Sequence, residues 1–249
     1  MVGKSLARLA MATAPPAQRF AVVVVAAGKG ERARQGVPKQ FANWRGKPVV
    51  RHAVERLVAC GAGPIAVAIP AGEAQTAQTA LAGLPVQFVT GGETRQASVR
   101  AALEALTSAA PQTVLIHDAA RPDCPHEVVD RLLEALQTYA GAIPVLPVID
   151  SVVVAAGTVM EDRAERALLH RVQTPQAFRF GEILAAHRDW SCAPDAGDDA
   201  QVLHAAGGEV ALVAGDERLA KLTFAGDFMA GQPAIRVGQG YDVHRLVAG

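Results

Sequence analysis

The sequence predicts an α/β fold with a Rossmann-like, mostly parallel β-sheet. Its short runs of apolar, β-branched residues, beginning with residues 22–25, are typical of strands that a parallel sheet buries on both faces. Between these runs, apolar residues recur at helical spacing. Alternating strands and helices favour right-handed crossovers, and such sheets bind ligands at the carboxyl ends of their strands.

The composition sets limits on the function. The chain has 249 residues, 50% of them hydrophobic, which is enough for one substantial α/β core. Its 24 basic residues equal its 24 acidic ones, so a nucleic-acid partner, which would need a broadly basic face, is not expected. No apolar run approaches the ~20 residues that cross a bilayer. Because the three cysteines are widely spaced and no convincing signal peptide precedes them, we expect reduced thiols and a cytoplasmic protein without a membrane partner.

The first strand leads into a long loop over residues 26–47. Its small residues and glycines let backbone N–H groups approach a phosphate, whose charge nearby cations would offset. We therefore predict a site for a nucleoside triphosphate at this loop. The small residues are Ala26, Ala27, Gly28 and Gly30, and the cations are Lys29, Arg32, Arg34 and Lys39.

A dinucleotide-binding turn is the alternative for this loop, because residues 28–33 fit the fingerprint G-x-G-x-x-G/A. That fingerprint needs a helix opening at the second glycine, but Gly36, Pro38 and Gly46 disfavour one here. The acidic residue expected roughly 20 positions further on is also missing from the end of a second strand. A long, ordered, cationic loop is therefore favoured.

The next elements continue the alternation. Periodicity predicts a helix over residues 48–60, a strand over 65–69, a weak helix over 74–81 and a strand over 86–89. Gly91 and Gly92 follow that strand, and Thr94 is a candidate N-cap for a helix over residues 95–106. This turn is either a second backbone-rich binding turn or a plain connection. Its place after a strand of the same sheet favours binding.

A fourth buried strand, residues 114–116, leads directly into polar residues. Asp118 stands at the carboxyl end of the strand, where it could contact Mg²⁺ or a ribose hydroxyl. Arg121 could bind a phosphate through its forked guanidinium. A structural salt bridge between the two is the alternative, and their position before Pro122 favours a functional role.

The C-terminal half departs from the alternation. After a helix over residues 127–139 comes a strand over 142–149, whose Pro144 and Pro147 predict an edge or bulged strand. Two strand-like segments, residues 152–154 and 167–172, predict a protruding β-hairpin arm over about 150–173, which would join two copies as a homodimer.

Three further elements complete this part of the chain. We expect a helix over residues 181–188, then a helix ending at 206 that Asp198 and Asp199 cap, and a strand over 210–213. Residues 218–223 are predicted as a short strand that returns Lys221 to the site.

Taken together, motifs spread over about residues 20–229 closely resemble, in the same order, those of the family of 2-C-methyl-D-erythritol 4-phosphate cytidylyltransferase, an enzyme of the non-mevalonate isoprenoid pathway. The first motif by itself indicates only a nucleotidyltransferase of sugar-phosphate type, whereas the ordered set is specific to this family. The motifs are Ala26-Ala27-Gly28-x-Gly30-x-Arg32, Pro38-Lys39-Gln40, Gly91-Gly92-x-x-Arg95-x-x-Ser98, His117-Asp118-Ala119-Ala120-Arg121-Pro122 and Thr174-Pro175-Gln176.

The resemblance implies a bacterial enzyme with a nucleotidyltransferase fold of the GT-A type. It would transfer CMP from CTP to methylerythritol phosphate and release pyrophosphate, with Mg²⁺ as cofactor. The acceptor phosphate is already an oxyanion at neutral pH, so no general base is needed. Catalysis must align two anions and stabilise charge on the α-phosphate and the leaving group.

The resemblance also implies roles for individual residues. Arg32 and Lys39 would be the transition-state cations, whereas Lys221 and Arg166, the latter reaching from a partner subunit's arm, would position the acceptor phosphate. Ser151 stands where threonine is commoner in the family. The implied CTP contacts are Ala26, Ala27, Gly28, Gly30, Gly92, Glu93, Ser98 and Ala119, and the implied acceptor contacts are Asp118, Arg121, Ser151 and Thr174.

The tail carries a second resemblance. Residues 234–246 resemble the opening of 2-C-methyl-D-erythritol 2,4-cyclodiphosphate synthase, in which residues matching Asp242 and His244 are metal ligands. A strand would place both on one face, as joint ligation requires. We therefore expect a disordered tail over residues 1–18, a cytidylyltransferase domain over 19–230, and a linker and first strand of a truncated synthase domain over 231–249. Zn²⁺ or another divalent metal would bind only in the complete second domain of such a bifunctional fusion.

Two alternative functions remain open. One is a related sugar-phosphate nucleotidyltransferase that uses another base. The other is a non-catalytic, nucleotide-binding scaffold for the fused domain. The joint presence of Arg32, Lys39, Arg166 and Lys221 favours a catalyst over a scaffold.

Overall fold

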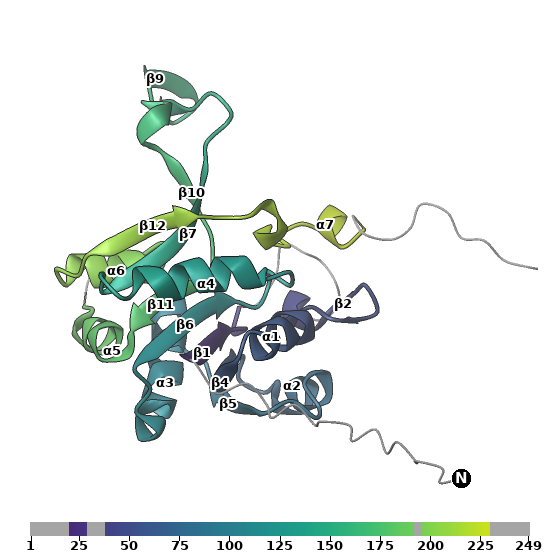
Figure 1. Ribbon diagram of the computed structural model, residues 1–249. Coiled ribbons are helices and arrows are strands. Elements are labelled where there is room, and N and C mark those ends of the chain that lie inside the picture. The colour runs from purple at the N-terminus through teal and green to yellow at the C-terminus, as the bar shows by residue number, and fades with distance from the viewer. Residues whose placement is uncertain (1–19, 29–37, 192–195, 230–249) are drawn as a thin grey trace, which may run out of the picture.

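A computed structural model describes residues 20–28, 38–191 and 196–229 of the chain. The predicted tails, residues 1–18 and 231–249, lie outside this part, and the domain limits expected there stay predictions. Figure 1 shows one α/β body with helices on both faces of a twisted sheet and a hairpin that projects from it. Among the described residues, no helix has the length and apolar character needed to span a bilayer.

The sheet is organised around β1 (Phe20–Val25), which pairs in parallel with β4 (Ala62–Ile69) and β6 (Thr113–Asp118). β5 (Val86–Thr90) lies beyond β4, so the chain winds outward on one side of β1 and then crosses to its other side. This reversal is the topological switch point at which such sheets bind ligands. Beyond β6 lie β11 (Gln176–Arg179), β7 (Gly141–Pro147) and β12 (Val210–Ala214).

Helices cover both faces because side chains alternate along each buried strand. Val22 and Val24 of β1 belong to one hydrophobic cluster, and Ala21 and Val23 belong to the other. The first cluster packs under α1 (Val49–Ala59), α2 (Ala74–Ala80) and α4 (His126–Ala135), the second under α3 (Arg95–Ala105), α5 (Phe180–Asp189) and α6 (Asp199–Ala205). The predicted α/β fold with a mostly parallel sheet is thus confirmed.

A small third cluster ties the C-terminal segment to the first loop. Trp44 of β2 (Asn43–Trp44) and Val49 pack with Leu222 and with Phe228 of α7 (Ala225–Met229). Between β1 and α1 the described loop also contains the short helix η2 (Lys39–Phe41) and β3 (Lys47–Pro48), which pairs with β2. This packing brings two segments that are far apart in sequence to the same edge of the sheet.

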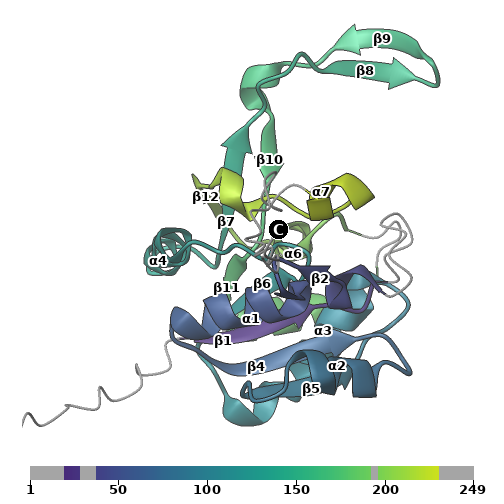
Figure 2. The same ribbon diagram turned by 90° about the vertical axis from the view of Figure 1, so that its right-hand side faces the viewer.

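The predicted arm is present, with a different second strand. β8 (Val153–Ala156) pairs with β9 (Val159–Arg163) around Gly157, whose φ of 60° suits a tight turn. The hairpin stands clear of the sheet (Figure 2). We expected residues 167–172 to form its second strand, but β10 (His170–Val172) pairs with β7 in the main sheet. Because the turn at Gly157 lets β8 pair with the strand that follows it directly, β10 is available to pair with β7.

β7 is an interior strand, so the prediction of an edge or bulged strand was wrong. It pairs with β12 on one side and with β11 and β10 on the other. The register changes between β11 and β10, but the extra residues lie in that partner segment and β7 itself is not bulged. Pro144 falls between the residues that pair with β11 and those that pair with β10, and Pro147 is the last residue of the strand. Neither proline therefore interrupts continuous pairing on that side.

Two smaller predictions also differ from the structure. Residues 218–223 form no strand, because they contain the end of η5 (Glu217–Leu219) and a segment joined to a distant part of the chain by one backbone hydrogen bond, from Leu222 N to Ala120 O at 2.8 Å. The antiparallel strand β11 escaped prediction, since a four-residue strand next to a helix shows no clear alternation.

Candidate active site

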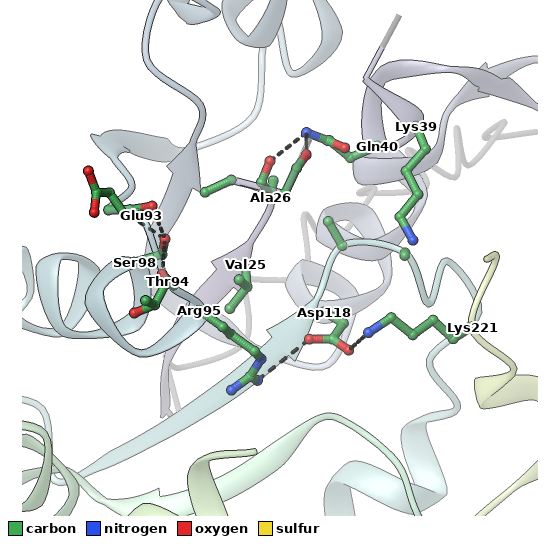
Figure 3. A pocket seen from close by; sticks show the side chains of 15 residues that line it. Val25, Ala26, Lys39, Gln40, Glu93, Thr94, Arg95, Ser98, Asp118 and Lys221 are labelled. Carbon is green, nitrogen blue, oxygen red and sulfur yellow. Dashed lines mark hydrogen bonds and ion pairs between the residues drawn. The ribbon is translucent and has the colours of Figure 1, made fainter. Parts of the chain in front are cut away.

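A cavity of about 780 Å³ lies at the carboxyl ends of β1, β5 and β6. It is lined by residues 25–28 at the end of β1, by residues 92–95 and 98 at the start of α3, and by residues 118–120 at the end of β6, together with Lys39, Gln40 and Lys221. In Figure 3, Lys39, Asp118 and Lys221 face one another across the cavity, and Glu93, Thr94 and Ser98 lie on another side of it. The predicted phosphate-binding loops and the predicted strand-end aspartate therefore share one cavity.

The first loop is held in shape by Gln40, a residue to which we assigned no role. Its buried side-chain Nε2 donates to the Ala26 carbonyl at 2.6 Å and to the Gly28 carbonyl at 3.0 Å. Both carbonyls are thus tied to η2. Ala26, Ala27 and Gly28 line the cavity as expected, whereas Gly30 and Arg32 lie outside the described residues.

The second loop is an N-capped helix start, as predicted. Thr94 Oγ1 accepts from Ala97 N at 3.1 Å, and Ser98 Oγ accepts from Gly92 N at 3.1 Å. Gly91 and Gly92 need to be glycines because neighbouring residues approach them too closely to leave room for a side chain. A Cβ on Gly91 would overlap that of Ala27 in the first loop, and one on Gly92 would lie 2.5 Å from Ala97 Cβ. Gly92, Glu93 and Ser98 line the cavity.

Asp118 is the electrostatic centre of the site. Only 8% of the residue is exposed, and its carboxylate lies 2.8 Å from Lys221 Nζ, 3.5 Å from Arg95 and 3.9 Å from Arg121. Burial alone would raise the pKa of Asp118, but the charges of Arg95 and Lys221 hold that pKa well below its usual range. Asp118 is therefore an anion at any pH near neutrality.

Arg95 connects this aspartate to a second buried carboxylate. Its NH2 lies 2.7 Å from Asp199 Oδ2, and the other oxygen of Asp199 lies 3.1 Å from His187 Nε2. We predicted that Asp198 and Asp199 both cap α6. Asp198 does so, since its Oδ1 accepts from Gln201 N at 3.0 Å, but Asp199 is a buried ion-pair partner of Arg95. The prediction for Asp199 was wrong because its partner is remote in sequence.

The two lysines expected in the site both reach it. Lys39 Nζ donates to the Leu222 carbonyl at 3.1 Å, so η2 and the segment around Lys221 are joined beside the cavity.

Thr174 Oγ1 accepts from Asp118 N at 3.0 Å, and Ala119 lines the cavity. Arg121 lies next to Asp118 and donates to the Leu219 carbonyl.

Two residues of the predicted site lie elsewhere in the subunit. Ser151 and Arg166 belong to the arm, and Arg166 NH1 donates to the Ile149 carbonyl at 2.7 Å. Both are exposed, and neither lines the cavity of its own chain. Asp242 and His244, the predicted metal ligands of the tail, lie outside the described residues. Within the described ranges, no cluster of three or more His, Cys, Asp or Glu side chains could hold a metal ion.

Comparison with known proteins gives consistent results. The family model of 2-C-methyl-D-erythritol 4-phosphate cytidylyltransferase matches residues 20–236. A bifunctional enzyme IspD/IspF of Erythrobacter litoralis is 63% identical over 240 residues, which cover 96% of this chain and 62% of that protein. The chain therefore spans less than two thirds of this relative.

Solved structures of similar proteins share the fold. The crystal structure of 2-C-methyl-D-erythritol 4-phosphate cytidylyltransferase from Thermus thermophilus has a TM-score of 0.71 at 34% identity, covering 85% of this chain and 96% of that one. The bifunctional IspDF from Campylobacter jejuni has a TM-score of 0.72 at 27% identity, covering 84% of this chain and 53% of that one.

Proposed function

We propose that this chain, which belongs to the 2-C-methyl-D-erythritol 4-phosphate cytidylyltransferase family, transfers CMP from CTP to 2-C-methyl-D-erythritol 4-phosphate. The observation that carries the proposal is the single cavity in which two glycine-containing loops meet Asp118 and Lys221. The loops suit a nucleoside triphosphate, and the charged cluster suits a second, polyhydroxylated anion.

The reaction requires positioning more than proton transfer. An oxygen of the acceptor phosphate bonds to the α-phosphorus of CTP, the bond from that phosphorus to the bridging oxygen breaks, and pyrophosphate leaves. Lys39, together with Arg32, would stabilise the negative charge that grows on the α-phosphate and the leaving group. Lys221, Arg121 and an Arg166 from a second subunit would hold the acceptor phosphate in line.

The nucleotide would occupy the two loops beside β1 and β5. The small side chains of Ala26, Ala27, Gly28 and Gly92 leave their backbone open to the triphosphate and the base, with Glu93, Ser98 and Ala119 beside them. Asp118 would accept hydrogen bonds from acceptor hydroxyls, because its depressed pKa keeps it ionised. Thr174 and Ser151 are the further acceptor contacts that we propose.

Family members are nucleotidyltransferases that commonly use a divalent metal ion, and we propose Mg²⁺ for this one. The carboxylates that line the cavity are Glu93 and Asp118, and the oxygens of Asp118 already face cations. This donor set fits an ion that takes most of its ligands from the triphosphate, as Mg²⁺ commonly does. When bound, the ion would neutralise phosphate charge.

We also propose that the arm joins two copies into a homodimer. The arm exposes large apolar side chains, since Val159, Met160 and Leu168 are 67%, 61% and 77% exposed. Covering them with a second subunit would remove apolar area from water. Arg166 could then serve the partner's cavity. Light scattering should show a dimer at micromolar concentration, and a stable monomer would contradict the proposal.

Subunit mixing tests the role of Arg166. An Arg166→Ala subunit mixed with a Lys39→Ala subunit would form heterodimers with one intact site if Arg166 acts across the interface. Activity should therefore rise above that of either preparation alone when the two are mixed. If Arg166 acts within its own chain, every site in the mixture lacks one cation, and activity stays absent.

The relatives named bifunctional suggest a second domain in the whole protein. We propose that it makes the 2,4-cyclodiphosphate, with Asp242 and His244 among the ligands of Zn²⁺ or another divalent ion. We place the protein in the bacterial cytoplasm, where the buried thiols of Cys60 and Cys124 would stay reduced.

One assay separates the proposed function from its alternatives. Pyrophosphate release is measured with CTP, UTP, ATP or GTP and Mg²⁺, each with and without methylerythritol phosphate. Release only with CTP and the acceptor supports the proposal. Release with another nucleotide indicates a related transferase, and no release despite CTP binding indicates a scaffold.

A further inference from the structure

His117, the residue before Asp118, has no part in the reaction proposed above, yet it is completely buried beside the site. It forms hydrogen bonds through both ring nitrogens. Nε2 lies 2.9 Å from the Arg121 carbonyl oxygen, and Nδ1 lies 3.2 Å from Thr174 Oγ1. A buried imidazole with two polar partners in the wall of a binding site needs an explanation.

The partners indicate where the protons are. The Arg121 carbonyl only accepts, so Nε2 carries the proton that it donates. Thr174 Oγ1 accepts from Asp118 N at 3.0 Å and keeps its own hydrogen for Nδ1. The hydrogen bonds therefore run from Asp118 N through Thr174 to His117 and on to Arg121, and a neutral imidazole satisfies each of them.

These bonds hold both ends of one turn. Residues 118–121 form a turn closed by a hydrogen bond from Arg121 N to Asp118 O at 3.0 Å. Its first residue is held through Thr174, and its last through the carbonyl bonded to His117. The middle of the turn matters as well, because Leu222 N donates to Ala120 O at 2.8 Å, next to Lys221.

We propose that His117 is a positioning residue for the acceptor site, because as a neutral imidazole protonated on Nε2 it fixes the turn that presents Asp118, Arg121 and Lys221. The identity of the acceptor rests on the function proposed above. His117 touches no substrate in this proposal. It acts through the two ends of the turn.

The surroundings keep the ring neutral. Burial lowers the pKa of His117 to about 4, while backbone contacts with Arg121 and Thr174 oppose that shift. The charged groups that face it are Asp118, which favours the protonated ring, and Arg121, which disfavours it. At neutral pH the ring can therefore serve both as donor and as acceptor.

Two amide substitutions separate the two bonds. In His117→Asn the amide lies near the Nδ1 position and can still bond Thr174, and in His117→Gln it lies near the Nε2 position and can still donate to Arg121. We expect each to raise KM for methylerythritol phosphate on the order of tenfold, as for the loss of one buried hydrogen bond. The Kd for CTP, measured by calorimetry, should stay within about twofold, because the nucleotide loops are untouched.

His52 offers a matched control. Its Nε2 also bonds a backbone carbonyl, that of Trp44 at 2.7 Å, but it lies on α1 and does not line the cavity. His52→Gln should leave KM for both substrates unchanged. The proposal is overturned if the His117 variants keep the wild-type KM for the acceptor, or if they weaken CTP binding as much as acceptor binding.

Thr174 is proposed above as an acceptor contact as well, so its variants give a second test in which the double variant separates that contact from the bond to His117. Thr174→Val removes the bridging hydroxyl and should raise KM for the acceptor, whereas Thr174→Ser keeps the hydroxyl and should restore it. In the Thr174→Val background, His117→Gln should add nothing, because the bond it breaks is already lost. A further tenfold increase there would show that His117 and Thr174 act independently.

A spectroscopic measurement makes the inference testable apart from the reaction. Nitrogen-15 NMR of the wild-type protein at pH 7 should show a neutral His117 protonated on Nε2. A ring protonated on Nδ1, or doubly protonated, would overturn the inference even if pyrophosphate release is normal. If the wild type releases no pyrophosphate with any acceptor, the proposed function fails, and this measurement still decides the state of His117.

Discussion

Asp199 and Arg95 form a buried ion pair, with Asp199 Oδ2 2.7 Å from Arg95 NH2, that links α6 to the wall of the cavity. Arg95 is shared, because the same nitrogen lies 3.5 Å from Asp118 Oδ1. Burial alone would raise the pKa of Asp199, but the charge of Arg95 and the hydrogen bond with His187 lower it. The carboxylate therefore holds Arg95 in place at neutral pH.

Asp199→Asn should destabilise the protein by about 3–5 kcal/mol, because it leaves a buried guanidinium without its closest counter-ion. The free energy of unfolding in urea measures this loss. Asp198→Asn is the matched control, since asparagine caps a helix about as well as aspartate and the change should stay within about 0.5 kcal/mol. Equal losses in the two variants would contradict the structural importance of the pair.

Gly91→Ala should weaken CTP binding on the order of tenfold or more, because the added methyl overlaps Ala27 and would push the two nucleotide loops apart. Calorimetric titration with CTP measures the change. Gly181→Ala, at a position in α5 where an added Cβ meets nothing within 4 Å, should leave CTP binding unchanged. Equal affinities of the Gly91 and Gly181 variants would mean that the loops need not approach closely.

Lys39→Ala should lower turnover on the order of 100-fold, as expected for the loss of one preorganised charge at the reacting phosphates. Steady-state pyrophosphate release at saturating substrates gives the turnover number. Lys47→Ala removes a neighbouring lysine whose partner is Glu55, at 2.7 Å on the exposed surface, and should have almost no effect. Near-normal turnover of Lys39→Ala would exclude this lysine from the mechanism.

The stability of the protein should fall between pH 6.5 and about 4 because of His117. The pKa of this histidine is lowered from 6.5 to about 4 in the folded chain, so the unfolded chain binds the proton more readily. The contribution is present above pH 6.5 and is lost as the pH falls towards 4, by roughly 3 kcal/mol in all. Asp118 and Asp199, whose pKa values are lowered, stay ionised over this range.

Urea unfolding of wild type and His117→Gln at several pH values checks this expectation. The variant lacks the titrating ring, so its stability should depend less on pH between 6.5 and 4. The two proteins should differ in slope as well as in absolute stability. Parallel curves would show that His117 is not the group that titrates.

Much of the fold follows from local patterns. The valine run of β1, the apolar strands β4 and β6, and the cap at Thr94 were each expected from the residues themselves. Strand burial, helix spacing and capping depend on neighbours in sequence, so sequence alone carries them. The glycine loops and Asp118 were assigned to one site because carboxyl ends of parallel strands share an edge.

Other features depend on which distant segments meet. The pairing of β7 on both sides and of β10 within the main sheet rests on backbone hydrogen bonds, which carry almost no sequence signal. The bonds from Gln40 to the Ala26 and Gly28 carbonyls form only because η2 packs against the first loop, and the sequence does not show that packing. These assignments therefore had to wait for the tertiary structure.

The sequence by itself determined the α/β class, the glycine loops and the lysines and aspartate that converge on the cavity, because each follows from local periodicity, turn chemistry or an ordered set of motifs. Only the tertiary structure decided that Asp199 neutralises Arg95 and that His117 braces the turn beside Asp118. Apart from the bond between His117 and Arg121, these interactions join residues that are far apart in sequence, so burial and mutual distance, rather than spacing along the chain, determine which polar groups become partners.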